Sequence, residues 1–223
     1  MVDEVSPAVL SRRAFVFGVP LVAAACVSAP QEPIGPYVDP YYVTMYGPVP
    51  NERYPLPAID ISRVNPMFYR QVVSYPTVER PGTLVVDPFN KFLYLVQENG
   101  QAMRYGVGVG KEGLDWNGRA TIQRKAEWPR WTPTKDMIAR DPRNAEWANG
   151  MEPGLDNPLG ARALYLYQNG RDTLYRIHGT REPYSIGTAV SSGCIRLINQ
   201  DIIDLYSRVP IGTEVVVLGA GMV

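Results

Sequence analysis

The chain carries one histidine, His178, and one of its two cysteines, Cys194, follows it 16 residues later. A thiol attacks efficiently as its thiolate, and a neighbouring imidazole is the usual base that generates it. Taken singly, a lone histidine is more often a structural residue and a cysteine a small buried hydrophobe. The run Ser191-Ser192-Gly193 before Cys194 favours chemistry instead, because small residues let backbone N–H groups approach a substrate oxygen. The pair predicts covalent catalysis by a cysteine, with His178 as its base.

Three motifs around this pair resemble those of a known family. They are His178-Gly179-Thr180, Ser185-Ile186-Gly187 and Ser191-Ser192-Gly193-Cys194-Ile195-Arg196-Leu197. Together they resemble the L,D-transpeptidase catalytic domain family (YkuD type), whose members remodel bacterial peptidoglycan. Many members carry His-Gly-Cys where this chain has Ser192-Gly193-Cys194, which leaves His178 as the sole candidate base. The resemblance covers residues 82–219 and implies a mainly β, β-sandwich-like fold with one or two short helices.

The resemblance also implies a reaction. The Cys194 thiolate attacks the carbonyl on the L-centre of the third residue of a peptidoglycan stem peptide and expels D-alanine. An amine then resolves the acyl-enzyme to form a cross-link, or water resolves it. The N–H groups around Ser192, Gly193 and Cys194 are the implied oxyanion donors. The carbonyl of Gly179 orients the imidazole, Ser191 is a supporting hydrogen-bonding residue, carbapenems acylate Cys194, and no cofactor is needed.

Arg196, two residues after the expected nucleophile, has two interpretations. A guanidinium holds a carboxylate through two parallel hydrogen bonds, which favours a substrate-binding role. The alternative is a structural ion pair. Arg181 and Glu182 lie in the loop expected to face Cys194, where they either contact substrate or are simply solvated.

Other functional classes stay open. One is a cysteine hydrolase, either an L,D-carboxypeptidase on the same fold or a papain-like endopeptidase. Papain-like enzymes place the cysteine before the histidine in the chain, which is the reverse of the order here. A non-catalytic cell-wall-binding module is disfavoured because both His178 and Cys194 are retained. One histidine and one cysteine in the domain cannot supply the usual metal ligand set, and nothing suggests a nucleotide cofactor.

Composition limits the partners. The 22 basic residues balance the 22 acidic ones, so the chain lacks the basic footprint of a nucleic-acid-binding protein. The expected partners are peptidoglycan stem peptides, as acyl donor and as amine acceptor, with an envelope protein as an alternative acceptor. Contact with a membrane is expected only through an export signal or a lipid anchor.

The N-terminal residues 1–26 predict a signal peptide. Ser11-Arg12-Arg13-Ala14-Phe15-Val16 resembles the twin-arginine export motif, and residues 15–25 form an apolar run shorter than the ~20 residues that span a bilayer. Cleavage is expected after Ala25 or Ala29; alternatively, residues 23–26 are a degenerate lipobox with Cys26 lipidated. The expected location is the periplasm or cell envelope.

Residues 27–81 are rich in proline and tyrosine, which disfavours long helices and central strands. We expect an extended tether over residues 27–50 and an ordered arm over 51–81 whose aromatic residues pack on the domain. The catalytic domain then spans residues 82–219. Its predicted strands cover residues 83–87, 91–96, 101–109, 119–125, 162–168, 173–178 and 213–218.

Three further features set the expected surroundings of the site. Asn169-Gly170 predicts a type I′ hairpin turn that leads into the strand ending at His178. Asn199 is expected to cap a short helix over residues 200–208. The long segment 128–160 carries Trp128 and Trp131, which either anchor it in the core or contact substrate, and a short helix is expected over residues 134–140.

Overall fold

The computed structural model describes residues 37–110, 116–190 and 194–219, all within a compact unit that spans Pro36–Val223. The expected signal peptide, Cys26 and the first part of the expected tether lie outside the described residues. Among the described helices, none has the length and apolar character needed to cross a membrane.

Strands dominate the described residues, and the mainly β fold predicted from the sequence is confirmed. They form a sheet with the order β1-β4-β3-β2-β11-β6-β7-β8-β10-β5-β9. The bounds are β1 (Gln71–Ser74), β2 (Leu84–Asp87), β3 (Phe92–Val96), β4 (Gln101–Gly106), β5 (Gly108–Gly110), β6 (Gly118–Glu127), β7 (Arg162–Gln168), β8 (Arg171–His178), β9 (Ala189–Val190), β10 (Ile195–Arg196) and β11 (Glu214–Val217).

Short helices complete the described part of the chain. The α-helices are α1 (Pro40–Met45), α2 (Lys135–Arg140) and α3 (Asn199–Arg208). The 3₁₀ turns are η1 (Ile61–Arg63), η2 (Pro66–Phe68), η4 (Pro142–Trp147) and η5 (Pro183–Ser185). Within the predicted catalytic domain, the described α-helices are α2 and α3, in agreement with the one or two expected.

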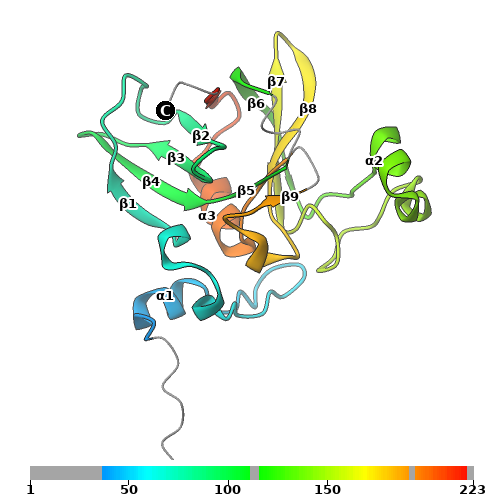
Figure 1. Ribbon diagram of the computed structural model, residues 1–223, viewed down its shortest axis with the longest axis horizontal. Coiled ribbons are helices and arrows are strands. Elements are labelled where there is room, and N and C mark those ends of the chain that lie inside the picture. The colour runs from blue at the N-terminus through cyan, green and yellow to red at the C-terminus, as the bar shows by residue number, and fades with distance from the viewer. Residues whose placement is uncertain (1–36, 111–115, 191–193, 220–223) are drawn as a thin grey trace, which may run out of the picture. The chain divides into compact units, whose positions relative to one another are not determined.

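The two halves of the sheet share one apolar core. In Figure 1 the strands β1 to β4 and the strands β6 to β8 lie on either side of α3. Buried side chains from both halves and from α3 form a single cluster, which includes Leu84, Leu93, Ile122, Leu164, Ile202 and Leu205. Each such side chain contributes about 1.5–3 kcal/mol by leaving water. The core thus fixes the sheet that carries both candidate catalytic residues.

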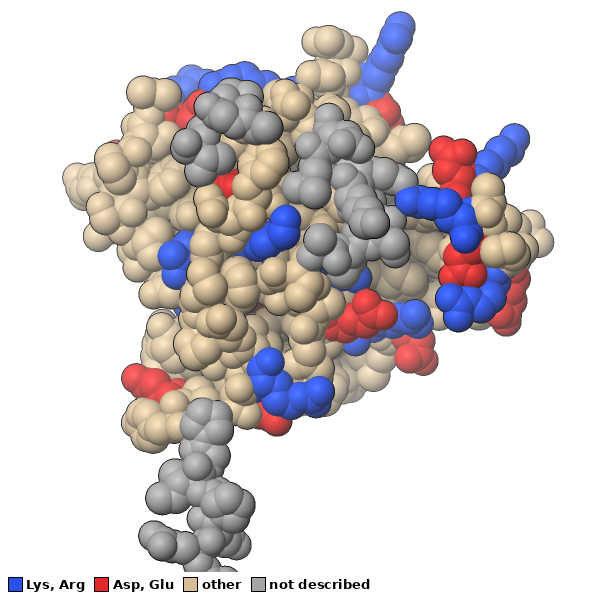
Figure 2. Space-filling view, in the orientation of Figure 1, with Lys and Arg blue, Asp and Glu red and all other residues tan. Residues whose placement is uncertain are grey.

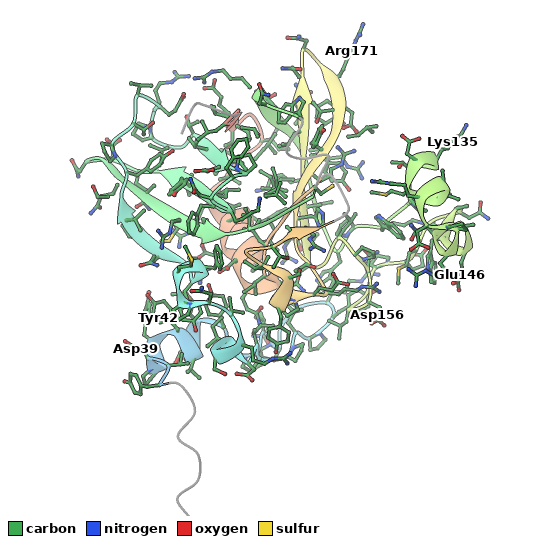
Figure 3. The ribbon with its side chains drawn as sticks, in the orientation of Figure 1. Asp39, Tyr42, Lys135, Glu146, Asp156 and Arg171 are labelled. Atoms are coloured by element: carbon green, nitrogen blue, oxygen red, sulfur yellow. The ribbon has the colours of Figure 1, made fainter. Side chains whose placement is uncertain are left out.

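The β7–β8 hairpin positions His178 at its end. Its turn residues Asn169 and Gly170 both have positive φ, 52° and 74°, as a type I′ turn requires, so the predicted turn is confirmed. β7 has the bounds expected from the sequence, whereas β8 begins at Arg171, two residues earlier. The turn lies at the far tip of the hairpin, where Figure 3 labels Arg171.

The structure differs from the expected extended tether where residues 37–50 are described. Asp39 caps α1 by accepting a hydrogen bond from the N–H of Tyr41 (2.8 Å). Tyr46 is fully buried in a second apolar cluster, together with Ile186 and Ile198 of the catalytic domain. Proline and tyrosine content misled the prediction because tyrosine rings that reach a core can order an otherwise proline-rich segment.

The arm over residues 51–81 contributes the strand β1 to the sheet. β1 pairs with β4 in antiparallel register, from Gln71 opposite Arg104 to Ser74 opposite Gln101. It is an edge strand, the position that proline-rich segments tolerate best. Tyr69 is buried and Phe68 packs at an angle against Phe92, with ring centroids 5.5 Å apart, so part of the expected aromatic packing is observed.

The helix after the motif is present, but its expected cap is not. α3 begins at Asn199, and the N-cap residue is Ile198, which provides no side-chain cap. The Asn199 side chain instead accepts a hydrogen bond from the N–H of Ala161 (2.9 Å) and donates one to the carbonyl of Thr180 (3.0 Å). The prediction of an Asn199 cap was therefore wrong, because two backbone groups of neighbouring segments take up its amide.

Candidate active site

His178 ends one strand, and Cys194 directly precedes the parallel strand beside it. β8 and β10 pair in parallel, with Ile195 opposite Ile177 and Arg196 opposite His178, and the N–H of Leu197 donates to the carbonyl of His178 (2.9 Å). On its other side β10 pairs with β5, and the N–H of Gly110 donates to the carbonyl of Cys194 (3.3 Å). Pairing on both sides fixes the backbone that follows Cys194.

His178 and Cys194 line one cavity. Its volume is about 420 Å³, and its wall comes from the ends of β8 and β10 and from the segment around α2. The lining residues are Trp131, Met137, Arg140, Asp141, Asn144, Pro158, Leu159, His178, Arg181, Glu182, Cys194 and Arg196. The structure thus brings together the base and the nucleophile that the sequence predicted.

The His178 ring is held as a neutral base. Its Nδ1 lies 2.6 Å from the carbonyl oxygen of Gly179, and a carbonyl can only accept, so Nδ1 carries the proton and Nε2 keeps its lone pair. The side chain is buried, and burial lowers its pKa to about 4 against the opposing hydrogen bond to Gly179; the nearby charge of Arg196 lowers it further. At neutral pH the imidazole is therefore uncharged, with its one N–H proton on Nδ1.

Gly179 is the orienting residue, and its own position is fixed from three sides. Its N–H donates to the carbonyl of Arg162 on β7 (3.0 Å). A Cβ at residue 179 would overlap Oδ1 of Asn199 and press on the backbone nitrogen of Ala161 and on Ile202. The close approach explains why glycine follows the histidine, and it makes Asn199 a site residue that the sequence had assigned to a helix cap.

Arg196 forms the structural ion pair that was one of its two interpretations. Its Nη1 donates to Oε2 of Glu182 (3.2 Å) and its Nη2 to Oγ of Ser185 (3.0 Å), with 10% of the side chain exposed. Burial lowers the pKa of the guanidinium, while Glu182 and Cys194 raise it. Arg196 thus ties the η5 turn to β10, the strand that directly follows Cys194.

The two tryptophans of segment 128–160 have different surroundings. Trp128 is buried, packs edge-on against Tyr54 (centroids 4.9 Å apart) and donates from Nε1 to Oε2 of Glu52 (2.8 Å). Trp131 lines the cavity instead. One tryptophan therefore anchors the segment, and the other is in position to meet a ligand.

The segment that follows Trp131 and contains α2 and η4 forms a lobe that extends beside the cavity. α2 begins after Thr134, whose side chain accepts a hydrogen bond from the N–H of Met137 (3.2 Å), and the helix predicted over residues 134–140 is confirmed. Figure 3 labels Lys135 and Glu146 on this lobe, and Figure 2 shows its basic and acidic residues interspersed. Met137, Arg140, Asp141 and Asn144 reach the cavity from it, and no motif in the sequence indicated them.

Some predicted site residues lie outside the described residues. These are Ser191, Ser192 and Gly193, so their proposed hydrogen-bonding roles stay predictions. Cys194 itself is described and half-buried. Among the residues that the structure describes, no group of three or more His, Cys, Asp or Glu side chains is arranged to hold a metal ion.

Comparison with known proteins places this site in a class. The sequence model of the L,D-transpeptidase catalytic domain (YkuD) matches residues 81–217, more than half of the chain. The chain is 36% identical over 151 residues to the probable L,D-transpeptidase ErfK/SrfK of Escherichia coli (strain K12), covering 66% of this chain and 47% of that protein. It is 39% identical over 137 residues to a putative L,D-transpeptidase in the ATP synthase subunits region (ORF 5) of Fuscovulum blasticum, covering 60% and 68%.

Among solved structures, a crystal structure from Brucella melitensis described as a probable carnitine operon oxidoreductase caia is 52% identical. It covers 71% of this chain and 99% of that chain, with a TM-score of 0.49, a likeness that carries no argument about activity. The chain spans about half the length of the first Escherichia coli relatives it matches.

A mainly β domain with a thiol and a buried neutral imidazole in one cavity defines the class of site. The match over residues 81–217 shows that the chain belongs to the L,D-transpeptidase catalytic domain (YkuD) family, and the family predicted from the motifs is confirmed.

Proposed function

We propose that the protein is a peptidoglycan L,D-transpeptidase with Cys194 as nucleophile and His178 as base. The observation that supports this best is that both residues line one cavity, while the Gly179 carbonyl holds the imidazole in the tautomer with an available Nε2. Its substrate is a stem peptide with a carbonyl on an L-centre joined to a terminal D-alanine.

The first half-reaction forms a thioester. Nε2 of His178 takes the thiol proton, and the sulfur of Cys194 bonds to the substrate carbonyl carbon, whose oxygen becomes an oxyanion. When the carbonyl re-forms, the C–N bond to D-alanine breaks, and the imidazolium gives its proton to the leaving amine. Atoms and charges balance without a cofactor.

The low pKa of His178 decides how the resting imidazole is charged. With its pKa at about 4, the imidazole is neutral at pH 7 and can accept a proton. In the proposed mechanism this neutral imidazole takes the thiol proton by general-base catalysis. Backbone N–H groups of Ser192, Gly193 and Cys194 are the proposed oxyanion donors, and Ser191 is the proposed supporting residue.

The second half-reaction releases the acyl group. An amine of a second stem peptide attacks the thioester and loses its proton to His178, which leaves a cross-link and restores the thiol. An envelope protein amine is an alternative acceptor. Water as acceptor makes the enzyme an L,D-carboxypeptidase, and the family match together with both retained residues supports either enzyme over a binding module. The proposed location is the cell envelope, reached through the export signal in residues 1–26, with lipidation of Cys26 as the anchored alternative.

The test is mass spectrometry of purified tetrapeptide muropeptides after incubation with the protein. Loss of D-alanine together with a cross-linked dimer is the expected result, and Cys194→Ala should abolish both. Cys26→Ala is the matched control, because it removes the other cysteine and should react normally. Tripeptide without dimer identifies the carboxypeptidase, and an unchanged substrate with folded wild-type protein contradicts both enzymes.

A further inference from the structure

Both carboxylates that line the candidate catalytic cavity are paired with arginines, whereas Arg181 on the same wall contacts an uncharged carbonyl. The cavity has two lining carboxylates. Asp141 is paired with Arg143 through two hydrogen bonds of 2.9 and 2.8 Å, and Glu182 is paired with Arg196. Arginines other than Arg181 therefore neutralise both carboxylates, and Arg181, the neighbour of Glu182 in the chain, also lines this cavity.

Arg181 keeps its charge available to a ligand. It is exposed, and its Nη1 donates to the backbone carbonyl of Asp156 (3.2 Å). A carbonyl carries no net charge, so this hydrogen bond orients the guanidinium without neutralising it. Because a guanidinium has five N–H donors in a planar fork, most of them stay available for a planar anion such as a carboxylate.

Arg181 also lines a second, smaller cavity. This cavity has a volume of about 200 Å³, and its wall is mostly apolar. The lining residues other than Arg181 are Leu56, Pro57, Ile59, Leu155, Thr180, Pro183, Asn199 and Gln200. Arg181 thus borders both the catalytic cavity and a small apolar recess, which suits a residue that carries a carboxylate beside a short alkyl side chain.

We propose that Arg181 binds a carboxylate of the stem peptide, with the alkyl side chain beside that carboxylate in the 200 Å³ recess. The role expected of Arg196 thereby moves to Arg181, because the charge of Arg196 is already paired with Glu182, whereas Arg181 contacts an uncharged carbonyl. The proposal rests on the proposed function, since it names the substrate group that this cavity recognises. Two stem carboxylates have this chemistry, the terminal one of the leaving D-alanine and an internal one.

The experiment compares Arg181→Gln with wild type on three stems: an unmodified tetrapeptide, its C-terminal amide, and a stem with internal carboxylates amidated. Hydrogen bonds to a charged group contribute about 1.5–3 kcal/mol, so kcat/KM on the unmodified stem should fall about 10- to 100-fold. On the stem whose amide replaces the bound carboxylate, Arg181→Gln and wild type should have the same kcat/KM. The stem that shows this equality identifies which carboxylate Arg181 binds. Arg171→Gln, on the distant hairpin tip (Figure 3), is the matched control and should not change kcat/KM.

A binding measurement separates this proposal from the proposed function. In a Cys194→Ala background, which cannot turn over, Kd for the unmodified stem should rise about 10- to 100-fold when Arg181 becomes Gln. If wild type fails to react but binding still depends on Arg181, the recognition site stands and the transpeptidase assignment falls. Equal losses on all three stems, or a Kd unchanged by Arg181→Gln, overturns the proposal.

Discussion

Glu52 and Arg162 form a two-pronged ion pair between the N-terminal arm and β7. Nη2 of Arg162 donates to Oε1 (2.6 Å) and Nη1 to Oε2 (2.9 Å), with 13% of the glutamate and 8% of the arginine side chain exposed. The carbonyl of Arg162 accepts from Gly179, whose own carbonyl orients His178. Residue 52 lies outside the segment 81–217 that matches the family, so a part of the chain beyond that segment helps hold the base.

Replacing Glu52 with Gln should destabilise the protein. The change removes the nearer carboxylate of the buried Arg162 guanidinium and leaves only the exposed Glu127, 3.9 Å away. We expect this to cost about 2–4 kcal/mol in unfolding free energy. Urea unfolding at pH 7 measures it. Glu146→Gln, on the exposed part of the lobe, is the matched control and should stay within about 0.5 kcal/mol. Equal effects of the two substitutions would show that the ion pair contributes nothing beyond a surface charge.

The same pair predicts an acid-sensitive contribution. Burial raises the pKa of Glu52, but hydrogen bonds from Arg162 and Trp128 outweigh burial and hold that pKa below its ordinary 4.5. The folded state then binds fewer protons than the unfolded chain, so this stability is present above pH 4.5 and declines as pH falls through the folded pKa. Unfolding curves of wild type and Glu52→Gln should converge in that range; a difference that is constant with pH contradicts the assignment.

Burial of neutral His178 predicts a second pH dependence. Its pKa is about 4 in the folded protein and 6.5 in the reference state, so the unfolded chain binds the extra proton between these values. Stability is therefore complete above pH 6.5 and falls toward pH 4, by on the order of 3 kcal/mol. Wild type should lose more stability than His178→Gln between pH 7 and 4.5, and an identical loss in both proteins would falsify the low pKa.

The acid limb of the activity profile should reflect the same value. Because kcat/KM reports the free enzyme, it should fall with a midpoint near pH 4 rather than near 6.5. His178→Gln should lower kcat about 10²- to 10⁴-fold at pH 7 and regain rate at alkaline pH, where the thiol loses its proton without help from the imidazole. A variant with wild-type kcat, or with no gain at high pH, would remove His178 from the role of base.

Alanine at residue 179 should disturb both fold and activity. The added Cβ overlaps Oδ1 of Asn199, and overpacking of this kind costs about 1–3 kcal/mol. The shift it forces also moves the carbonyl that orients the imidazole, so kcat should fall more than KM rises. Gly154→Ala is the control, since nothing lies within 4 Å of the position its Cβ would occupy. Similar stability and kcat for the two variants would contradict the tight packing.

Local patterns in the sequence were enough to predict much of this structure. The Asn169-Gly170 turn closes the β7–β8 hairpin, and Thr134 marks the start of α2, because both signals act within a few residues. Asn199 also carries a local signal, for a helix cap, but its amide bonds to Ala161 and Thr180 across the fold. Contacts of that range depend on packing that no local pattern specifies.

The site shows the same division. His178 and Cys194 can be identified from residue type and spacing, whereas Met137 and Asn144 line the cavity only because the lobe that carries them lies beside it. The order of residues 37–50 was hidden for a similar reason. Tyr46 is buried by segments far along the chain, and its hydroxyl donates to Asp201 (3.2 Å).

That last contact has a consequence for synthesis. Tyr46 and Asp201 are separated by 155 residues, and at 5–20 residues per second the ribosome needs roughly 10–30 s to make the chain between them. During that time Tyr46 cannot reach the partner that buries it, and contacts so distant in sequence also form slowly. The segment that carries Tyr46 is therefore among the last parts of the protein to fold, and a chaperone would find it exposed on the nascent chain.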